Sequence, residues 1–295
     1  MNSAVEKLKR LRKRFYGSVV FLLMTLSGCI PDPLDVDVIP VVEPQIVVSS
    51  QMVPDQTLLV LLTRTFGALD ADENSDAEAL LNQISVNDAE VTITGPAGTY
   101  TLTALDHGAY GGVFIPFVEG ESYELKVNSA SLGEVSAVTK VSARVTFKTI
   151  EAKLRVNDFD DTVADITHRF KDVAGENFYM ITSQEIDRDD IIEDLLNPNA
   201  HIRLLKDTNF DGLEYGETFR VPRSRFDVGD SVLVSLSNIS PDYYHFMELR
   251  LDNRFSFIEY LSEPINYPSN INGGKGFFNL YVPDIRFLVL EQPDN

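Results

Sequence analysis

Cysteine is nearly absent from this sequence, because Cys29 is the only one among 295 residues. A single thiol excludes an intramolecular disulfide and a cysteine-based metal site. Tryptophan is absent as well, which weakens the case for a platform that stacks sugar rings. Histidine is rare, and the four present (His107, His168, His201 and His245) lack the spacing of a His-Glu-x-x-His metal site. Stability must therefore come from core burial.

Basic residues are also scarce, with 25 Lys and Arg against 45 Asp and Glu. Removing residues 1–28 takes away six basic residues and one acidic residue, which leaves 19 basic and 44 acidic residues and a net charge of −25. Such a surface repels nucleic acid, whose binding requires clustered Lys and Arg. Metal cations and basic partners are compatible with this charge.

Long apolar runs are missing, and the notable one is Phe15–Leu26. It follows six basic residues within 7–14, and at about 12 residues it is shorter than the roughly 20 that span a bilayer. The next residues, Ser27-Gly28-Cys29, complete a pattern that resembles the bacterial lipobox. We interpret residues 1–28 as a lipoprotein signal peptide, with acyl chains (palmitate) attached to Cys29. The alternative is a transmembrane signal anchor in which Cys29 is incidental.

Residues 29–44 are predicted to be an extended tether, because four prolines lie within 30–44. Asp32, Asp35 and Asp37 follow the anchor closely. They resemble the signal that moves lipoproteins of the Bacteroidota to the outer face of the outer membrane. The alternative is an ordinary solvated linker.

Residues 45–143 are predicted to form an antiparallel β-sandwich of immunoglobulin or transthyretin type. Apolar alternation and turn signals predict seven short strands there. They are 46–50, 57–65, 91–94, 99–103, 110–117, 122–127 and 134–141, and residues 95–98 form the hairpin loop between the third and fourth.

An acidic insertion at residues 66–85 interrupts this sandwich, with a short helical piece at 79–81. Asp70, Asp72, Asn74 and Asp76 match the first four ligand positions of a calcium loop. The turn glycine and the final glutamate of such a loop are missing, so a solvated loop is the main alternative.

Residues 144–295 are predicted to form a second β-rich domain with one or two short helices, so the whole chain is mainly β. The expected strands are 146–150, 164–170, 177–181, 217–221, 232–236, 277–282 and 285–290. An acidic helix is expected at 187–196. A second helix is expected from Ser240 to about Phe255, because Ser240-Pro241-Asp242 is a strong helix start.

A second calcium candidate is Asp207-Thr208-Asn209-Phe210-Asp211-Gly212. Asp207, Asn209 and Asp211 occupy positions 1, 3 and 5 of a calcium loop, and Gly212 occupies position 6. The glutamate at position 12 is missing, so the alternative is a plain turn between strands.

The order of several motifs is similar to that of a Bacteroidota lipoprotein family catalogued as domain of unknown function 4249. The motifs are the lipobox, Pro-Gln-Ile-Val-Val at 44–48, the hairpin at 91–102, Phe170-Lys171-Asp172, Asn177-Phe178-Tyr179, Asp207–Gly212, and Pro-Ser-Asn-Ile with its following glycines at 268–278. The family's usual Asn-Tyr-Tyr is Asn-Phe-Tyr here.

This resemblance implies an outer-membrane, surface-exposed lipoprotein that assists a TonB-dependent transporter, and it carries over no catalytic residue. We expect a non-enzymatic accessory module, since no nucleophile elbow occurs in the sequence. The alternative is independent capture of a peptide, glycan or metal complex, for which Tyr243, Tyr244, Tyr260 and Tyr267 are available. An enzyme is the third possibility.

Overall fold

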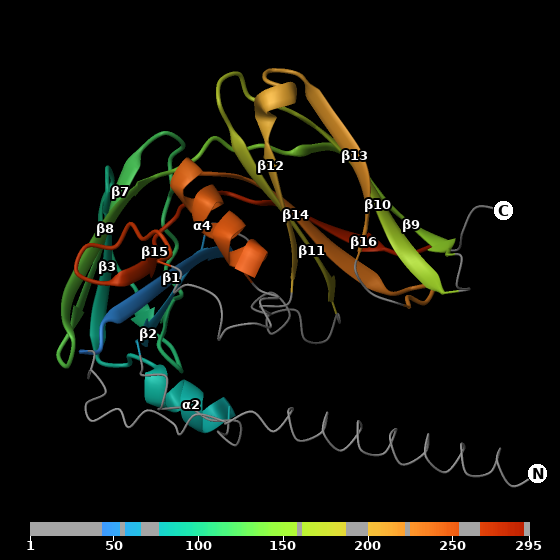
Figure 1. Ribbon diagram of the computed structural model, residues 1–295. Helices are drawn as coiled ribbons and strands as arrows, with labels where there is room; N and C mark the ends of the chain where they lie inside the picture. The colour runs from blue at the N-terminus through green and yellow to red at the C-terminus, as the bar shows by residue number, and fades with distance from the viewer. Residues whose placement is uncertain are drawn as a thin grey trace, which may run out of the picture. The chain divides into compact units, whose positions relative to one another are not determined.

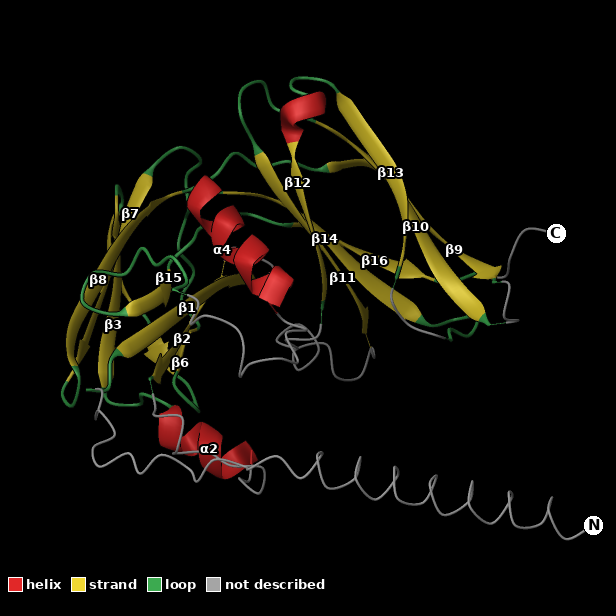
Figure 2. Ribbon diagram, in the orientation of Figure 1, coloured by secondary structure: helices red, strands yellow, loops and turns green. Residues whose placement is uncertain are grey.

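The computed structural model describes residues 43–53, 57–65, 77–157, 161–186, 200–221, 225–253 and 266–291. These residues are mainly β, in four sheets (Figures 1 and 2), which confirms the predicted fold class. Val42–Asn295 forms one compact unit. Neither helix in these ranges is long and apolar enough to cross a membrane.

The first sandwich is built from a five-stranded and a four-stranded sheet. The five-stranded order is β15 (Lys275–Phe277), β1 (Ile46–Val53), β2 (Thr57–Arg64), β6 (Ala109–Gly111) and β5 (Thr103–Ala104). The four-stranded order is β4 (Gly98–Thr101), β3 (Ala89–Gly95), β7 (Ser122–Ser129) and β8 (Gly133–Lys140).

Alternating apolar side chains give this sandwich its core. On β2, Leu58, Val60 and Leu62 are fully buried, and on β7 the same spacing buries Leu125 and Val127. Side chains two apart on a strand share a face, so each sheet has one apolar face. Both faces contribute to one cluster of mostly aliphatic residues.

The second sandwich is built from a three-stranded and a four-stranded sheet. The three-stranded order is β13 (Glu214–Arg220), β10 (Thr162–Lys171) and β9 (Phe147–Val156). The four-stranded order is β12 (His201–Lys206), β11 (Phe178–Ile186), β14 (Ser231–Ile239) and β16 (Asp284–Val289).

The core of the second sandwich contains many aromatic rings. Phe170 lies at its centre, with Tyr179 at a centroid distance of 4.9 Å and Tyr215 at 5.6 Å. His168 is fully buried beside them, and both ring nitrogens lack a hydrogen-bond partner. Burial raises the cost of charging this ring, so the pKa of His168 lies below its ordinary value although nearby Glu217 raises it.

Residues 271–280 pack in the first sandwich, although the sequence places them in the second domain. Strand β15 pairs with β1 in parallel, and Ile271, Phe278 and Leu280 join the first core. Gly276 permits this approach because its φ is +95° and an added Cβ would lie 2.0 Å from the Val48 carbonyl oxygen.

Two short helices flank the sheets. Helix α2 (Ala77–Ile84) extends the predicted piece at 79–81. Helix α4 (Pro241–Asn253) starts at the predicted position, and the Tyr243 N–H donates to Ser240 Oγ as an N-cap contact. Its Met247 packs with Phe178 and Met180 of β11. The predicted acidic helix at 187–196 lies outside the described residues.

Several predicted strand boundaries were wrong. The hairpin turn between β3 and β4 is tighter than the expected loop 95–98, since Gly95 pairs with Gly98. The strand expected at 110–117 is reduced to β6, which ends at Gly111 and is followed by Gly112 at a φ of +75°. The strand expected at 277–282 is β15, at 275–277. Strand β12 was not predicted, because its sequence lacks a clear alternation.

Candidate functional site: an acidic turn between β12 and β13

The predicted calcium motif forms the connection between β12 and β13, which we call the acidic turn (residues 207–212). Its first three residues, Asp207–Asn209, form a single turn of 3-10 helix. The Phe210 N–H closes this turn by donating to the Asp207 carbonyl at 2.7 Å. Gly212 has a φ of +65°, which suits glycine. Phe210 then anchors the turn, since its ring lies 4.3 Å from that of Tyr215 in the second core.

The structure adds a third carboxylate that the sequence analysis did not assign to the site. Asp172 follows β10, and one carboxylate oxygen each from Asp172, Asp207 and Asp211 lies within 4.8 Å of the others. Asp172 and Asp207 are buried, whereas Asp211 is exposed. Asn209, the remaining predicted ligand, is exposed. Asp172 is far from the motif in sequence, so only the fold brings it to the site.

Each carboxylate of the cluster accepts hydrogen bonds from the loop between β10 and β11 or from the turn itself. Asp207 Oδ2 accepts from the Asn177 N–H at 2.6 Å, and Asp211 Oδ1 accepts from the Gly175 N–H at 2.9 Å. Asp172 accepts from the Tyr179 hydroxyl and from the Gly212 N–H. The three acids therefore join two loops at one end of the second sandwich.

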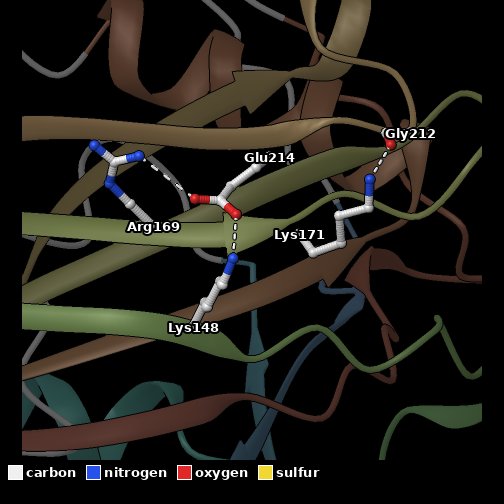
Figure 3. Close-up of polar contacts among 5 residues, drawn as sticks. All are labelled: Lys148, Arg169, Lys171, Gly212 and Glu214. Atoms are coloured by element: carbon white, nitrogen blue, oxygen red, sulfur yellow. Dashed lines mark hydrogen bonds and ion pairs between the residues drawn. The ribbon is translucent and has the colours of Figure 1, made fainter.

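Positive charge also lies beside the turn. Lys171 Nζ donates to the Gly212 carbonyl oxygen (Figure 3).

Burial, together with the hydrogen bond to Asp172, raises the pKa of Tyr179, so that this hydroxyl remains a donor to the carboxylate. The acidic turn is thus held by hydrogen bonds from Tyr179 and from backbone N–H groups.

Carboxylate oxygens are the ligands that calcium prefers, and three of them converge here. The same oxygens already serve as acceptors that hold the two loops, which is what a plain structural turn requires. Both interpretations use Asp207 and Asp211, and only the first requires an ion. Calcium binding at the acidic turn therefore stays a prediction.

The other candidate residues are dispersed or lie outside the described ranges. Cys29, Tyr260 and the acidic loop at 66–76 are outside them. Among the histidines, His107 lies 3.2 Å from Asn82 Oδ1, His168 is buried on β10, His201 is on β12 and His245 is on α4. The four histidines thus lie on separate elements.

The tyrosines proposed for ligand stacking pack mainly against the protein's own aromatic rings. Tyr243 lies 5.9 Å from Phe246 and 5.5 Å from Phe277, measured between ring centroids. Tyr244 lies 4.9 Å from Phe178. Tyr267 keeps 38% of its surface exposed. These rings connect α4 with β11 and β15.

Comparison with known proteins gives one extensive match. Residues 31–284 match the family model described as "Domain of unknown function (DUF4249)". No curated protein matches the chain.

Two solved structures with low similarity are a two-domain fibronectin type-III segment of chicken tenascin and a tetra-tandem repeat of a large adhesion protein. The first is 11% identical, with a TM-score of 0.21 over 66% of this chain and 91% of that one. The second is 14% identical, with a TM-score of 0.20 over 83% of this chain and 49% of that one.

Proposed function

Because the chain belongs to the DUF4249 family, we propose that it is a lipid-anchored, non-catalytic accessory module of a TonB-dependent transporter, on the outer face of the outer membrane. One observation carries this proposal. The family match begins at residue 31, two residues after the lipobox cysteine, and runs to residue 284. The lipobox thus stands where an anchor would be joined to the family region.

An exposed sheet edge supports a role in binding a partner. Strand β16 is last in its sheet order, although Glu291 just beyond it forms a parallel bridge with Lys153 of β9. Within the strand, Phe287 and Val289 expose 54% and 43% of their surface. These residues lie two apart and share one face of the strand. An edge strand with exposed apolar side chains is where another chain can add to a sheet. We propose that the transporter contacts this edge.

Independent ligand capture is the second candidate, and a polar hollow on the first sandwich favours it. The hollow has a volume of about 180 Å³ and is lined by Glu90, Thr92, Lys126, Val127, Asn128 and Glu134. Pockets that enclose small molecules usually measure about 300–1,000 Å³. This hollow is smaller, so the accessory role is the better supported of the two.

A pull-down from solubilised outer membranes tests the proposal. With a tag at the C-terminus, we expect one TonB-dependent barrel to co-purify in near-equal amount. The double variant Phe287→Ser/Val289→Ser should reduce the barrel at least tenfold, as expected when an interface loses its apolar anchors. Recovery of the lipoprotein alone would favour independent capture.

A matched control separates this edge from general surface effects. Val138 is 61% exposed on β8, an edge strand of the first sandwich. Val138→Ser removes a similar exposed apolar side chain from the other sandwich. The barrel should remain bound to this variant, and equal loss from both variants would contradict docking at β16.

A further inference from the structure

The outer face of the three-stranded sheet concentrates positive charge on an acidic protein. Strand register places alternate residues of β9, β10 and β13 on this face, away from the aromatic core, and a register shift opposite Arg169 and Phe170 adds Lys148 beside Thr149. Six of the 19 basic residues that follow Cys29 lie there, against three acidic residues, Glu151, Asp165 and Glu214. We call it the cationic face, and its basic residues are Lys148, Lys153, Arg155, Arg169, Lys171 and Arg220.

The basic side chains of this face are generally more exposed than the acidic ones that they pair with. The Arg169 side chain is 64% exposed and the Lys148 side chain 61%, whereas Glu214 between them is 33% exposed (Figure 3). Asp165 is only 22% exposed beneath Arg155 and Arg220. The hydrogen bond from Lys148 lowers the pKa of Glu214, so this acid remains charged. Glu151 is the exception, since it and its partner Lys153 are both 59% exposed. The face as a whole therefore carries an excess of exposed positive charge.

A glycine leaves space for one of the basic side chains on this face. Gly216 pairs with Arg169, and a Cβ at Gly216 would lie 2.7 Å from Arg169 Cγ. The glycine therefore leaves room for the arginine to lie across the neighbouring strand. A strand of ten residues such as β10 extends about 33 Å. Thr149, Thr167 and Thr218 fill positions between the charges.

We propose that the cationic face docks on the anionic headgroup layer of the membrane that carries the lipid anchor, and this inference rests on the proposed function. The central residues of protein–protein interfaces are enriched in Trp and Tyr as well as Arg, whereas this face combines its cations with threonines. A layer of anionic headgroups presents many negative charges to the excess of Lys and Arg on this face. The net charge of −25 after residue 28 disfavours other orientations on the same surface.

The anchor makes such a weak contact effective. The 16 residues from Cys29 to Pro44 can span at most about 55 Å, so the folded part stays near the membrane at high effective concentration. The anchor then provides the affinity for the membrane, and the cationic face only has to orient the folded part on it. Because the contact is electrostatic, it weakens as salt shortens the screening length.

Lysine acetylation on vesicles, read by mass spectrometry, tests this proposal. The chain from Cys29 onward keeps the whole compact unit Val42–Asn295, and its single thiol can be coupled to a maleimide lipid. One vesicle is phosphatidylcholine alone, and in the other about a third of the lipid is phosphatidylglycerol. On the anionic vesicle we expect Lys148, Lys153 and Lys171 to react about threefold more slowly. Exposed Lys126 and Lys140 of the first sandwich should be unaffected.

Paired arginine variants sharpen the test. Arg169→Gln/Arg220→Gln removes two charges from the face, yet Glu214 keeps Lys148 and Asp165 keeps Arg155 as partners. In this variant, the lysines of the cationic face should be acetylated at nearly the same rate on both vesicles. Arg144→Gln/Arg250→Gln removes the same charge from exposed sites elsewhere and should retain the slower acetylation on the anionic vesicle.

Equal acetylation rates on the two vesicles would overturn the proposal, as would protection that persists in the Arg169/Arg220 variant. The coupling is chemical, so either outcome is independent of whether cells attach a lipid to Cys29. The proposed function would then stand or fall by the pull-down alone.

Discussion

The two sandwiches solve the same packing problem with different residues. The first core is mostly aliphatic and depends on a strand, β15, that comes from near the end of the chain. The second core is built around aromatic rings and holds a buried histidine, and buried acids lie at one end of it. We therefore expect the stability of the first sandwich to depend on backbone geometry at β15, and the stability of the second to depend on pH. The predictions below test this contrast, from the largest effect to the smallest.

The largest effect is expected at Gly276, which brings β15 against β1. Gly276→Ala would place a methyl group against the Val48 carbonyl at a φ of +95°. We expect unfolding free energy to fall by about 3 kcal/mol or more, since neither the backbone angle nor the space suits alanine. Urea unfolding followed by circular dichroism measures the loss.

Gly133 provides the control for this prediction. It also has a positive φ, +85°, but an added Cβ would meet nothing within 4 Å. Gly133→Ala should therefore cost only about 1 kcal/mol, the strain of the left-handed backbone. Similar losses in both variants would show that the pairing of β15 with β1 contributes little.

The second sandwich should lose stability as pH falls. His168 has a pKa below its ordinary 6.5 because it is buried, so the unfolded chain binds its proton first. This contribution is fully present above about pH 6.5 and declines below it, with a slope of up to about 1.4 kcal/mol per pH unit. Tyr215, Glu217 and Arg203 face the ring. In a His168→Phe variant, Glu217 loses the His168 Nε2 at 3.6 Å but keeps its ion pair with Arg203 at 2.8 Å.

Urea unfolding at several pH values checks this prediction. The His168→Phe variant should show a flatter pH dependence between pH 6.5 and 5 than the natural chain. Phenylalanine suits a site surrounded by Phe147, Phe170 and Phe219. An unchanged slope would assign the acid sensitivity to other groups.

The smallest expected effect concerns calcium at the acidic turn. At ten times its dissociation constant, bound calcium should stabilise the chain by about 1.4 kcal/mol, because it binds only the folded site. Asp211→Asn should abolish this gain. The amide oxygen can still accept from Gly175, so stability without calcium should be retained. Thermal melting with and without calcium measures the gain from calcium and the stability in its absence. If the natural chain melts at the same temperature in the two conditions, the acidic turn does not bind calcium.

Sequence patterns predicted the elements whose signals are local. Strands such as β2 and β7 alternate apolar and polar residues, and the start of α4 carries its own cap at Ser240. Strand β15 could not be predicted as a partner of β1, because that pairing joins the two ends of the chain. Asp172 was missed as a site residue for the same reason, since tertiary packing alone brings it to the acidic turn.

The cationic face could not be predicted from the sequence for the same reason. Its six basic residues are scattered along three strands, and the net charge of the whole chain is strongly negative. Only the register of β9, β10 and β13 shows that they share a surface. The charge of the whole chain therefore predicted a surface that repels nucleic acid, but it could not reveal a local positive field.

Both proposals assume that the chain is held on a membrane through Cys29, and the intact mass of the protein purified from its native membrane tests this most directly. We predict a chain that begins at Cys29 and carries the added mass of acyl chains. A chain that retains residues 1–28, or one that begins at Cys29 without added lipid, would contradict the account.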